Sequence, residues 1–105
     1  MSITEQRIID KVKNGIFSID KNARIILFGS RARGSYRPES DWDFLVLTQK
    51  EINPGYRMDI IDKMLNVELE ENISIQIVPK NMDDWQKLYS VTALYKNIAE
   101  DGVEI

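Results

Sequence analysis

The chain has 105 residues, 43% of them hydrophobic and 30% charged, a composition typical of one folded domain spanning residues 1–105. It contains no cysteine and no histidine, which excludes disulfides, Ser-His triads, histidine general bases and most zinc sites. The net charge of −3 disfavours a general polyanion binder, and without an apolar run of about 20 residues or a signal-peptide pattern we expect a cytoplasmic protein with no membrane partner.

The first part of the chain predicts a helix followed by a strand. Ser2 and Glu5 have the spacing of a capping box. Apolar residues then recur at helical spacing, which predicts an amphipathic helix over residues 3–19. Its apolar stripe is Ile8, Ile9, Val12, Ile16 and Ile19. Residues 23–28 are short and rich in β-branched side chains, as in a strand covered on both faces.

The middle of the chain predicts a second strand and a long helix. Residues 41–48 form the strand, with their polar side chains at its entry. Asn53 is expected to cap the helix, and Pro54 occupies its first position. The apolar stripe expected to face the core is Ile60, Ile61, Met64, Leu65 and Leu69.

The last third predicts a strand, two helices and a terminal strand. Residues 73–79 alternate as a strand does, and Pro79 is expected to end it. Asn81 would cap a short helix, and Ser90 would cap a final helix that Gly102 stops. Residues 103–105 would add a short strand. The element order predicts the α/β (α+β) class, a mixed β-sheet with helices packed against it.

The connection between the first two strands carries the residues that suit phosphate chemistry. Gly29 directly follows a strand, and the lack of a Cβ there lets a phosphate approach the backbone. The amides at the start of a short helix, with the Ser30 hydroxyl, would then face that anion. Arg31 and Arg33 would neutralise further phosphate charge. No Gly-Lys-Ser/Thr follows, so this is not a Walker A loop.

Two aspartates stand at the other end of the same connection. Asp41 and Asp43 point to the same side of a strand, whereas Trp42 points the other way. Adjacent carboxylates raise each other's pKa unless a cation lies between them. Mg²⁺ is a natural occupant because it pairs one or two carboxylates with substrate phosphates.

Each of these features by itself is more often structural than functional. A Gly-Ser after a strand is usually a turn, an Asp-x-Asp is usually solvated or paired with arginine, and a run of arginines is usually a solvated surface. Their joint occurrence, with ten residues between Ser30 and Asp41, is what favours a functional site. A salt bridge from Arg31 or Arg33 to the aspartates stays open at this stage.

The segment LFGSRARG followed by SDWDFLV resembles the signature of the polymerase-β-type nucleotidyltransferase superfamily, and within it the minimal nucleotidyltransferase (MNT) family. The resemblance implies the polymerase-β-like nucleotidyltransferase fold for the whole chain. It also implies a nucleotide-binding role for Gly29 and Ser30. For Arg31 and Arg33 it implies a role in nucleotide binding that is partly structural. The same resemblance gives Asp41 and Asp43 a catalytic role as Mg²⁺ ligands.

The sequence departs from the family at one position. Fully equipped members carry a third carboxylate on the next strand, beside the Asp-x-Asp. The corresponding residue here is Ser74 or Gln76, and neither is a carboxylate. Glu70 and Glu71 precede that strand, and a replacement carboxylate would have to reach in from there, at the end of the helix.

The resemblance also implies a reaction and a partner. Minimal nucleotidyltransferases pair with helical HEPN-type proteins in toxin–antitoxin systems, and the implied reaction transfers AMP from ATP to a tyrosine of the toxin. We therefore expect a Mg²⁺-dependent enzyme that uses ATP or another nucleoside triphosphate. One alternative is a weakened relative that acts by nucleotide and partner binding. A nucleic-acid-binding module is the weakest alternative, and formation of a homo-oligomer is left open.

Overall fold

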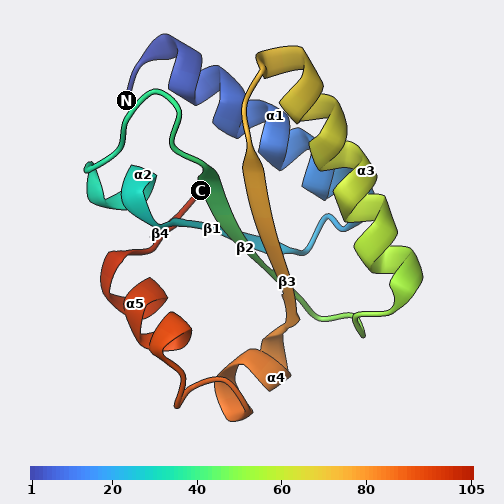
Figure 1. Cartoon of the computed structure of the whole chain (residues 1–105). Helices are drawn as coiled ribbons and strands as arrows, with labels where there is room; N and C mark the ends of the chain where they lie inside the picture. Colours follow the sequence, from blue (N-terminus) through green and yellow to red (C-terminus); the bar gives the residue numbers. More distant parts are fainter.

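A computed structural model describes all 105 residues of the chain. Its elements are α1 (Ile3–Ile19), β1 (Arg24–Phe28), α2 (Ser30–Arg33), β2 (Trp42–Thr48), α3 (Pro54–Glu71), β3 (Ile75–Asn81), α4 (Met82–Lys87), α5 (Ala93–Asp101) and β4 (Val103–Glu104) (Figure 1). None of the helices combines the length and the apolar composition that crossing a membrane requires.

The four strands form one mixed sheet in the order β3-β2-β1-β4. Strand β1 pairs antiparallel with β2 and with β4, and β2 pairs parallel with β3. A parallel pair needs a crossover connection, and α3 supplies it between β2 and β3. The mixed sheet predicted from the sequence, including its short terminal strand, is confirmed.

The two faces of the sheet are covered unequally. Helices α1 and α3 lie side by side on one face, and α4 and α5 lie on the other (Figure 1). The α1/α3 face holds a cluster of 15 buried residues, whereas the α4/α5 face holds only five. The second face is therefore the one with room for a ligand beside the strands.

Local capping signals in the sequence place the helix starts. Ser2 and Glu5 form the predicted capping box at the start of α1. Asn53 accepts a hydrogen bond from the Tyr56 amide at the start of α3, and Asn81 accepts from two amides of α4. Each of these hydrogen bonds satisfies an amide that the helix itself leaves without a partner.

The predicted core face of α3 is only partly correct. Ile60 and Met64 are buried as expected, together with Tyr56 and Val67. By contrast, the side chains of Ile61, Leu65 and Leu69 are 44%, 48% and 73% exposed. The helix has apolar residues on two sides, and only one side can face the sheet.

Several predicted boundaries also change. Pro79 does not end β3, which runs on to Asn81. Since β3 is an edge strand with β2 as its single neighbour, a residue without an N–H is tolerated there. The start of α5 is capped by Thr92, which accepts from the Tyr95 amide, and not by Ser90. Strands β1, β2 and β3 begin one or two residues later than predicted.

Ion pairs hold α1 against α3. Arg7 and Lys11 of α1 each contact Glu71 at 2.7 Å, and Lys11 also contacts Glu70 at 2.7 Å. The hydrogen bond from Arg7, followed by that from Lys11, lowers the pKa of Glu71 to about 2. The ionised form of Glu71 is therefore bound more favourably in the folded protein than in the unfolded chain.

This ion-pair cluster predicts a pH dependence of stability. The folded pKa of Glu71 is below its usual 4.5, so its contribution is complete above pH 4.5 and is lost as the pH falls through about 2. Glu71→Gln should be less stable than the wild type at pH 7, and the difference should close near pH 2. Urea unfolding across this range measures it, with the exposed Glu100→Gln as control. A difference that stays constant with pH would contradict the assignment.

Candidate functional site

The site begins where β1 ends, at a turn that only glycine accommodates easily. Gly29 has φ 75 and ψ −159, a backbone conformation that is essentially restricted to glycine. Its carbonyl oxygen accepts hydrogen bonds from the amides of Ala32 and Arg33, so α2 starts directly after the strand. The short helix predicted after Gly29 is confirmed.

The same glycine makes room for an aspartate of the neighbouring strand. A Cβ atom at Gly29 would collide with the carboxylate of Asp43. The two lie close because Phe28, the residue before the glycine, pairs with Asp43 across the antiparallel ladder. Strand pairing therefore brings the Gly-Ser turn and the Asp-x-Asp motif to one place.

Trp42 and Asp43 lie on opposite faces of the sheet, as predicted, whereas Asp41 lies outside the strand. Trp42 is only 1% exposed and packs in the α1/α3 cluster, on the face opposite to Asp43. Asp43 is half-buried, and Asp41 is exposed in the segment just before β2. The carboxylate pair lies at the end of the sheet where β1 stops and β2 starts.

The electrostatics of Asp43 show that its negative charge lacks compensation. Burial raises the pKa of Asp43 above its usual 3.8, and the neighbouring charge of Asp41 raises it further. The positive charge of Arg33 lowers the pKa of Asp43 and so opposes both effects. A bound cation would stabilise the two carboxylates, and oxygen ligands of this kind suit Mg²⁺.

Arg31 supports the loop that precedes β2. Its guanidinium donates to the carbonyl oxygens of Ser40 and Pro38, both at 3.1 Å. The same group lies 4.7 Å from the ring centroid of Tyr36 and 4.3 Å from that of Trp42. These contacts shape the loop that carries Asp41 and engage the Arg31 guanidinium, so the part of Arg31 in this structure is the structural one.

Arg33 forms an ion pair with an acidic residue of α5 and with neither aspartate of the Asp-x-Asp motif. Its closest acidic partner is Asp101 at the end of α5, at 4.0 Å. Neither Arg33 nor Arg31 forms an ion pair with Asp41 or Asp43, so the salt bridge that the sequence left open is absent. Arg33 is half-exposed and remains available to an anionic ligand.

The strand register decides which residue stands where the family has its third carboxylate. Asp43 of β2 lies opposite Gln76 of β3 in the parallel ladder. Ser74 precedes β3, and its backbone carbonyl oxygen accepts a hydrogen bond from the Trp42 amide at 2.9 Å. The neighbour of Asp43 is therefore an amide side chain. Sequence reasoning left this choice open because the pairing of β2 with β3 is not visible in either strand alone.

The replacement carboxylates suggested from the sequence are wrong. Glu70 and Glu71 pair with α1, on the opposite face of the sheet from Asp43. No group of three or more acidic residues in the structure has the geometry of a metal site. Asp41 and Asp43 therefore have no third carboxylate beside them, and their role as cation ligands stays a prediction.

Comparison with known proteins assigns the family. Residues 10–101 match the family described as "Polymerase beta, Nucleotidyltransferase". The chain is 32% identical over 79 residues to "Putative protein adenylyltransferase MJ0604" of Methanocaldococcus jannaschii, which covers 75% of this chain and 73% of that protein. It is 51% identical over 45 residues to MJ0141 of the same organism, named in the same way, covering 41% and 46% of the two chains.

Solved structures with the same fold are toxin–antitoxin complexes. A mutant of the toxin-antitoxin MntA-HpeT gives a TM-score of 0.59 at 20% identity, covering 95% of this chain and 70% of that one. A toxin-antitoxin with AMP-PNP gives a TM-score of 0.56 at 19% identity, covering 88% of this chain and 70% of that one. A tri-AMPylated Shewanella oneidensis HEPN toxin in complex with MNT antitoxin gives a TM-score of 0.54 at 18% identity, covering 97% of this chain and 68% of that one. At these identities the comparison shows the fold alone.

The mixed sheet, with its Gly-Ser turn set against an Asp-x-Asp strand, has the polymerase-β-like nucleotidyltransferase fold, as predicted. The chain belongs to the polymerase beta nucleotidyltransferase family, and the minimal type expected from the sequence is confirmed. The individual roles of the site residues remain predictions.

The close approach of Gly29 to Asp43 predicts an effect on stability. Gly34 also has a positive φ, 80, but open space around it, so Gly34→Ala should cost about 1 kcal/mol of unfolding free energy from backbone strain. Gly29→Ala should cost about 3 kcal/mol, since the new methyl group also meets Asp43. Denaturant unfolding measures both.

A double variant separates the collision from the backbone strain. In an Asp43→Ala background the cost of Gly29→Ala should shrink, because the carboxylate that the methyl group meets is gone. Equal costs in both backgrounds would show that Asp43 does not constrain this glycine.

The raised pKa of Asp43 predicts that its charge destabilises the fold. The folded state holds this proton more tightly than the unfolded chain, so stability falls as the pH rises from 3.8 through the folded pKa. Asp43→Asn should therefore be more stable than the wild type at pH 7, and the difference should disappear below pH 3.8. Thermal unfolding across this range measures it, and the exposed Asp59→Asn should show no such change.

Proposed function

We propose that this protein is a Mg²⁺-dependent nucleotidyltransferase that transfers AMP from ATP to a hydroxyl of a HEPN-type partner protein, as the antitoxin of a toxin–antitoxin pair. The observation that carries the proposal is the contact between the Gly29 turn and Asp43. It places a backbone suited to phosphate beside carboxylates suited to a divalent cation, which is the combination that phosphoryl transfer requires.

Each group of the site has a role in the proposed reaction. The backbone at Gly29, the Ser30 hydroxyl and the free side of Arg33 bind the triphosphate. Asp41 and Asp43 hold Mg²⁺, which when bound neutralises charge on the phosphates. Catalysis then rests on positioning and electrostatic stabilisation, without a covalent intermediate on the protein.

The bond changes of the proposed reaction are simple. The acceptor oxygen forms a bond to the α-phosphorus, the bond from that phosphorus to the bridging oxygen breaks, and pyrophosphate leaves. The hydroxyl proton passes to water, since Gln76 stands where a carboxylate base would lie. A reaction without that base is expected to be slow, which suits modification of one stable partner better than rapid turnover.

The names of similar proteins support the substrate and the partner. The relative MJ0604 is named a protein adenylyltransferase, and one structural neighbour is a complex with AMP-PNP. Another neighbour is an MNT antitoxin with an AMPylated HEPN toxin. These properties belong to those proteins, and we extend them to this chain because it belongs to the polymerase beta nucleotidyltransferase family and has the same fold as the two complexes.

One observation favours a second candidate function. Because Gln76 replaces the third carboxylate, the protein would also fit a role in which it binds nucleotide and neutralises the HEPN-type partner without transfer. A nucleic-acid-binding role is disfavoured, since Arg31 is engaged in the loop before β2 and is not free to contact phosphates of a nucleic acid.

Transfer of labelled AMP tests the proposal. Incubation with ATP, Mg²⁺ and the HEPN-type product of the neighbouring gene should label that product. Asp43→Asn should reduce labelling on the order of 10²–10³-fold while leaving the fold intact, as expected for loss of one charge-stabilising group. Asp59→Asn, an exposed aspartate of α3, should label at the wild-type rate.

The outcomes separate the two candidates. No labelling at high protein concentration would overturn the transfer function. If Asp43→Asn still neutralises the partner as well as the wild type does, the protein acts by binding. Under the transfer function, removal of Mg²⁺ with a chelator should abolish labelling.

A further inference from the structure

We propose that the groove between the sheet and helices α4 and α5 binds the adenine base of the nucleotide. The inference rests on the proposed function, since it assumes that a triphosphate lies at Gly29 and Asp43. The groove has a volume of about 290 Å³. Ligand pockets span about 300 to 1,000 Å³, so this groove lies at the small end of that range, as expected for the part of a site that holds a base.

The strand register connects the groove to the phosphate end of the site. Successive pairs on this face of the sheet are Phe28–Asp43, Ile26–Leu45 and Arg24–Leu47. The groove floor is made by the second and third of these pairs. Since each step along a strand face is about 6.6 Å, the floor starts about 7 Å from Asp43 and extends to about 13 Å. A nucleotide held at Asp43 by its phosphates reaches this region with its base.

A second contact ties the groove wall to the phosphate loop. Arg33 of α2 lies 4.0 Å from Asp101 at the end of α5, the helix that forms one wall. The loop proposed to bind phosphate and the wall of the groove are therefore adjacent parts of one surface, as a ligand that spans both requires.

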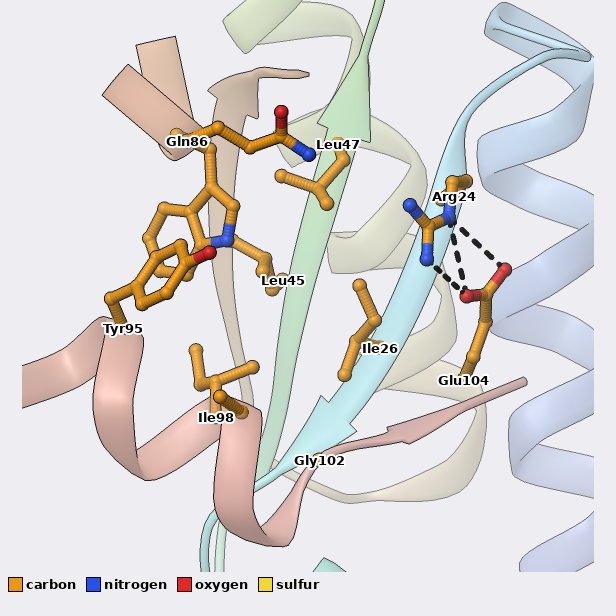
Figure 2. A pocket seen from close by; sticks show the side chains of 11 residues that line it. Arg24, Ile26, Leu45, Leu47, Gln86, Tyr95, Ile98, Gly102 and Glu104 are labelled. Atoms are coloured by element: carbon orange, nitrogen blue, oxygen red, sulfur yellow. Dashed lines mark hydrogen bonds and ion pairs between the residues drawn. The ribbon is translucent and has the colours of Figure 1, made fainter. Parts of the chain in front are cut away.

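The floor and walls of the groove suit a flat, neutral ring. Figure 2 shows Ile26 and Leu45 between Tyr95 on one side and Arg24 on the other. The ring of Tyr95 lies 5.1 Å from that of Trp85, at an interplanar angle of 37°. Tyr95 remains partly exposed, so its ring is available to a base. Stacking on an aromatic side chain changes affinity roughly tenfold or more.

The polar groups of the groove favour a base over a phosphate. Arg24 Nη2 lies 2.6 Å from a carboxylate oxygen of Glu104, so the charges at the far end are already paired (Figure 2). A second phosphate would find no free cation there. Gln86 places its amide at the rim, where one donor and one acceptor match the edge of a base.

The experiment compares two ligands that differ in the presence of the nucleoside. Calorimetric titration of the whole chain with Mg-ATP and with Mg-tripolyphosphate should show at least tenfold tighter binding of ATP. Ala99, on the exposed side of α5, lines the groove, so Ala99→Trp fills it from the rim. This variant should lower ATP affinity to that of tripolyphosphate and leave tripolyphosphate binding unchanged. Ala93→Trp, exposed on the same helix and outside the groove, should change neither.

A smaller substitution tests the groove in case the Ala99→Trp protein does not fold. Gln86→Ala removes an exposed amide and should weaken ATP binding several-fold without affecting tripolyphosphate. Equal wild-type affinity for the two ligands, or an ATP preference that survives Ala99→Trp, would overturn the inference. So would an Ala99→Trp protein that binds ATP normally but labels the partner poorly, since the groove would then belong to the partner.

The same titrations distinguish failure of this inference from failure of the proposed function. If Asp43→Asn abolishes tripolyphosphate binding while the base contributes nothing, the phosphate site stands and the base site does not exist. If Asp43→Asn leaves binding of both ligands unchanged, the phosphate site itself is wrong, and the inference falls with it.

Discussion

The backbone of Gly29 passes so close to Asp43 that no side chain fits between them, and the candidate site depends on this approach. The antiparallel pairing of β1 with β2 sets the distance, and the positive φ of Gly29 turns the chain into α2 immediately afterwards. A residue with a Cβ would displace either the carboxylate or the turn. The close packing of Gly29 against Asp43 thus fixes the positions of both the phosphate-binding and the cation-binding groups of the proposed reaction.

The two faces of the sheet have different roles, because helices cover them unequally. The α1/α3 face holds most of the core and the ion pairs of Glu71, so it supplies the stability of the fold. The α4/α5 face is thinly covered, and it carries Asp43 and the groove beside it. The raised pKa of Asp43 predicts that its charge destabilises the fold, and the core and ion pairs of the other face would offset that cost.

The sequence by itself determined the features that arise from local interactions. The capping box at Ser2 and the caps at Asn53 and Asn81 specify where α1, α3 and α4 start, since each cap bonds to amides only two or three residues away. The Gly-Ser and Asp-x-Asp motifs identified the candidate site for a similar reason. Both lie within one connection, and the chemistry of their residue types can be read without knowing their partners.

Only the tertiary structure decided the features that depend on contacts distant in the sequence. It selected which apolar side of α3 faces the sheet, leaving Leu65 exposed, because two sides of that helix are apolar. It placed Gln76 rather than Ser74 beside Asp43, because the register between β2 and β3 follows from pairing across a crossover. Local sequence patterns contain no information on these partners, since each contact forms only when separate elements pack.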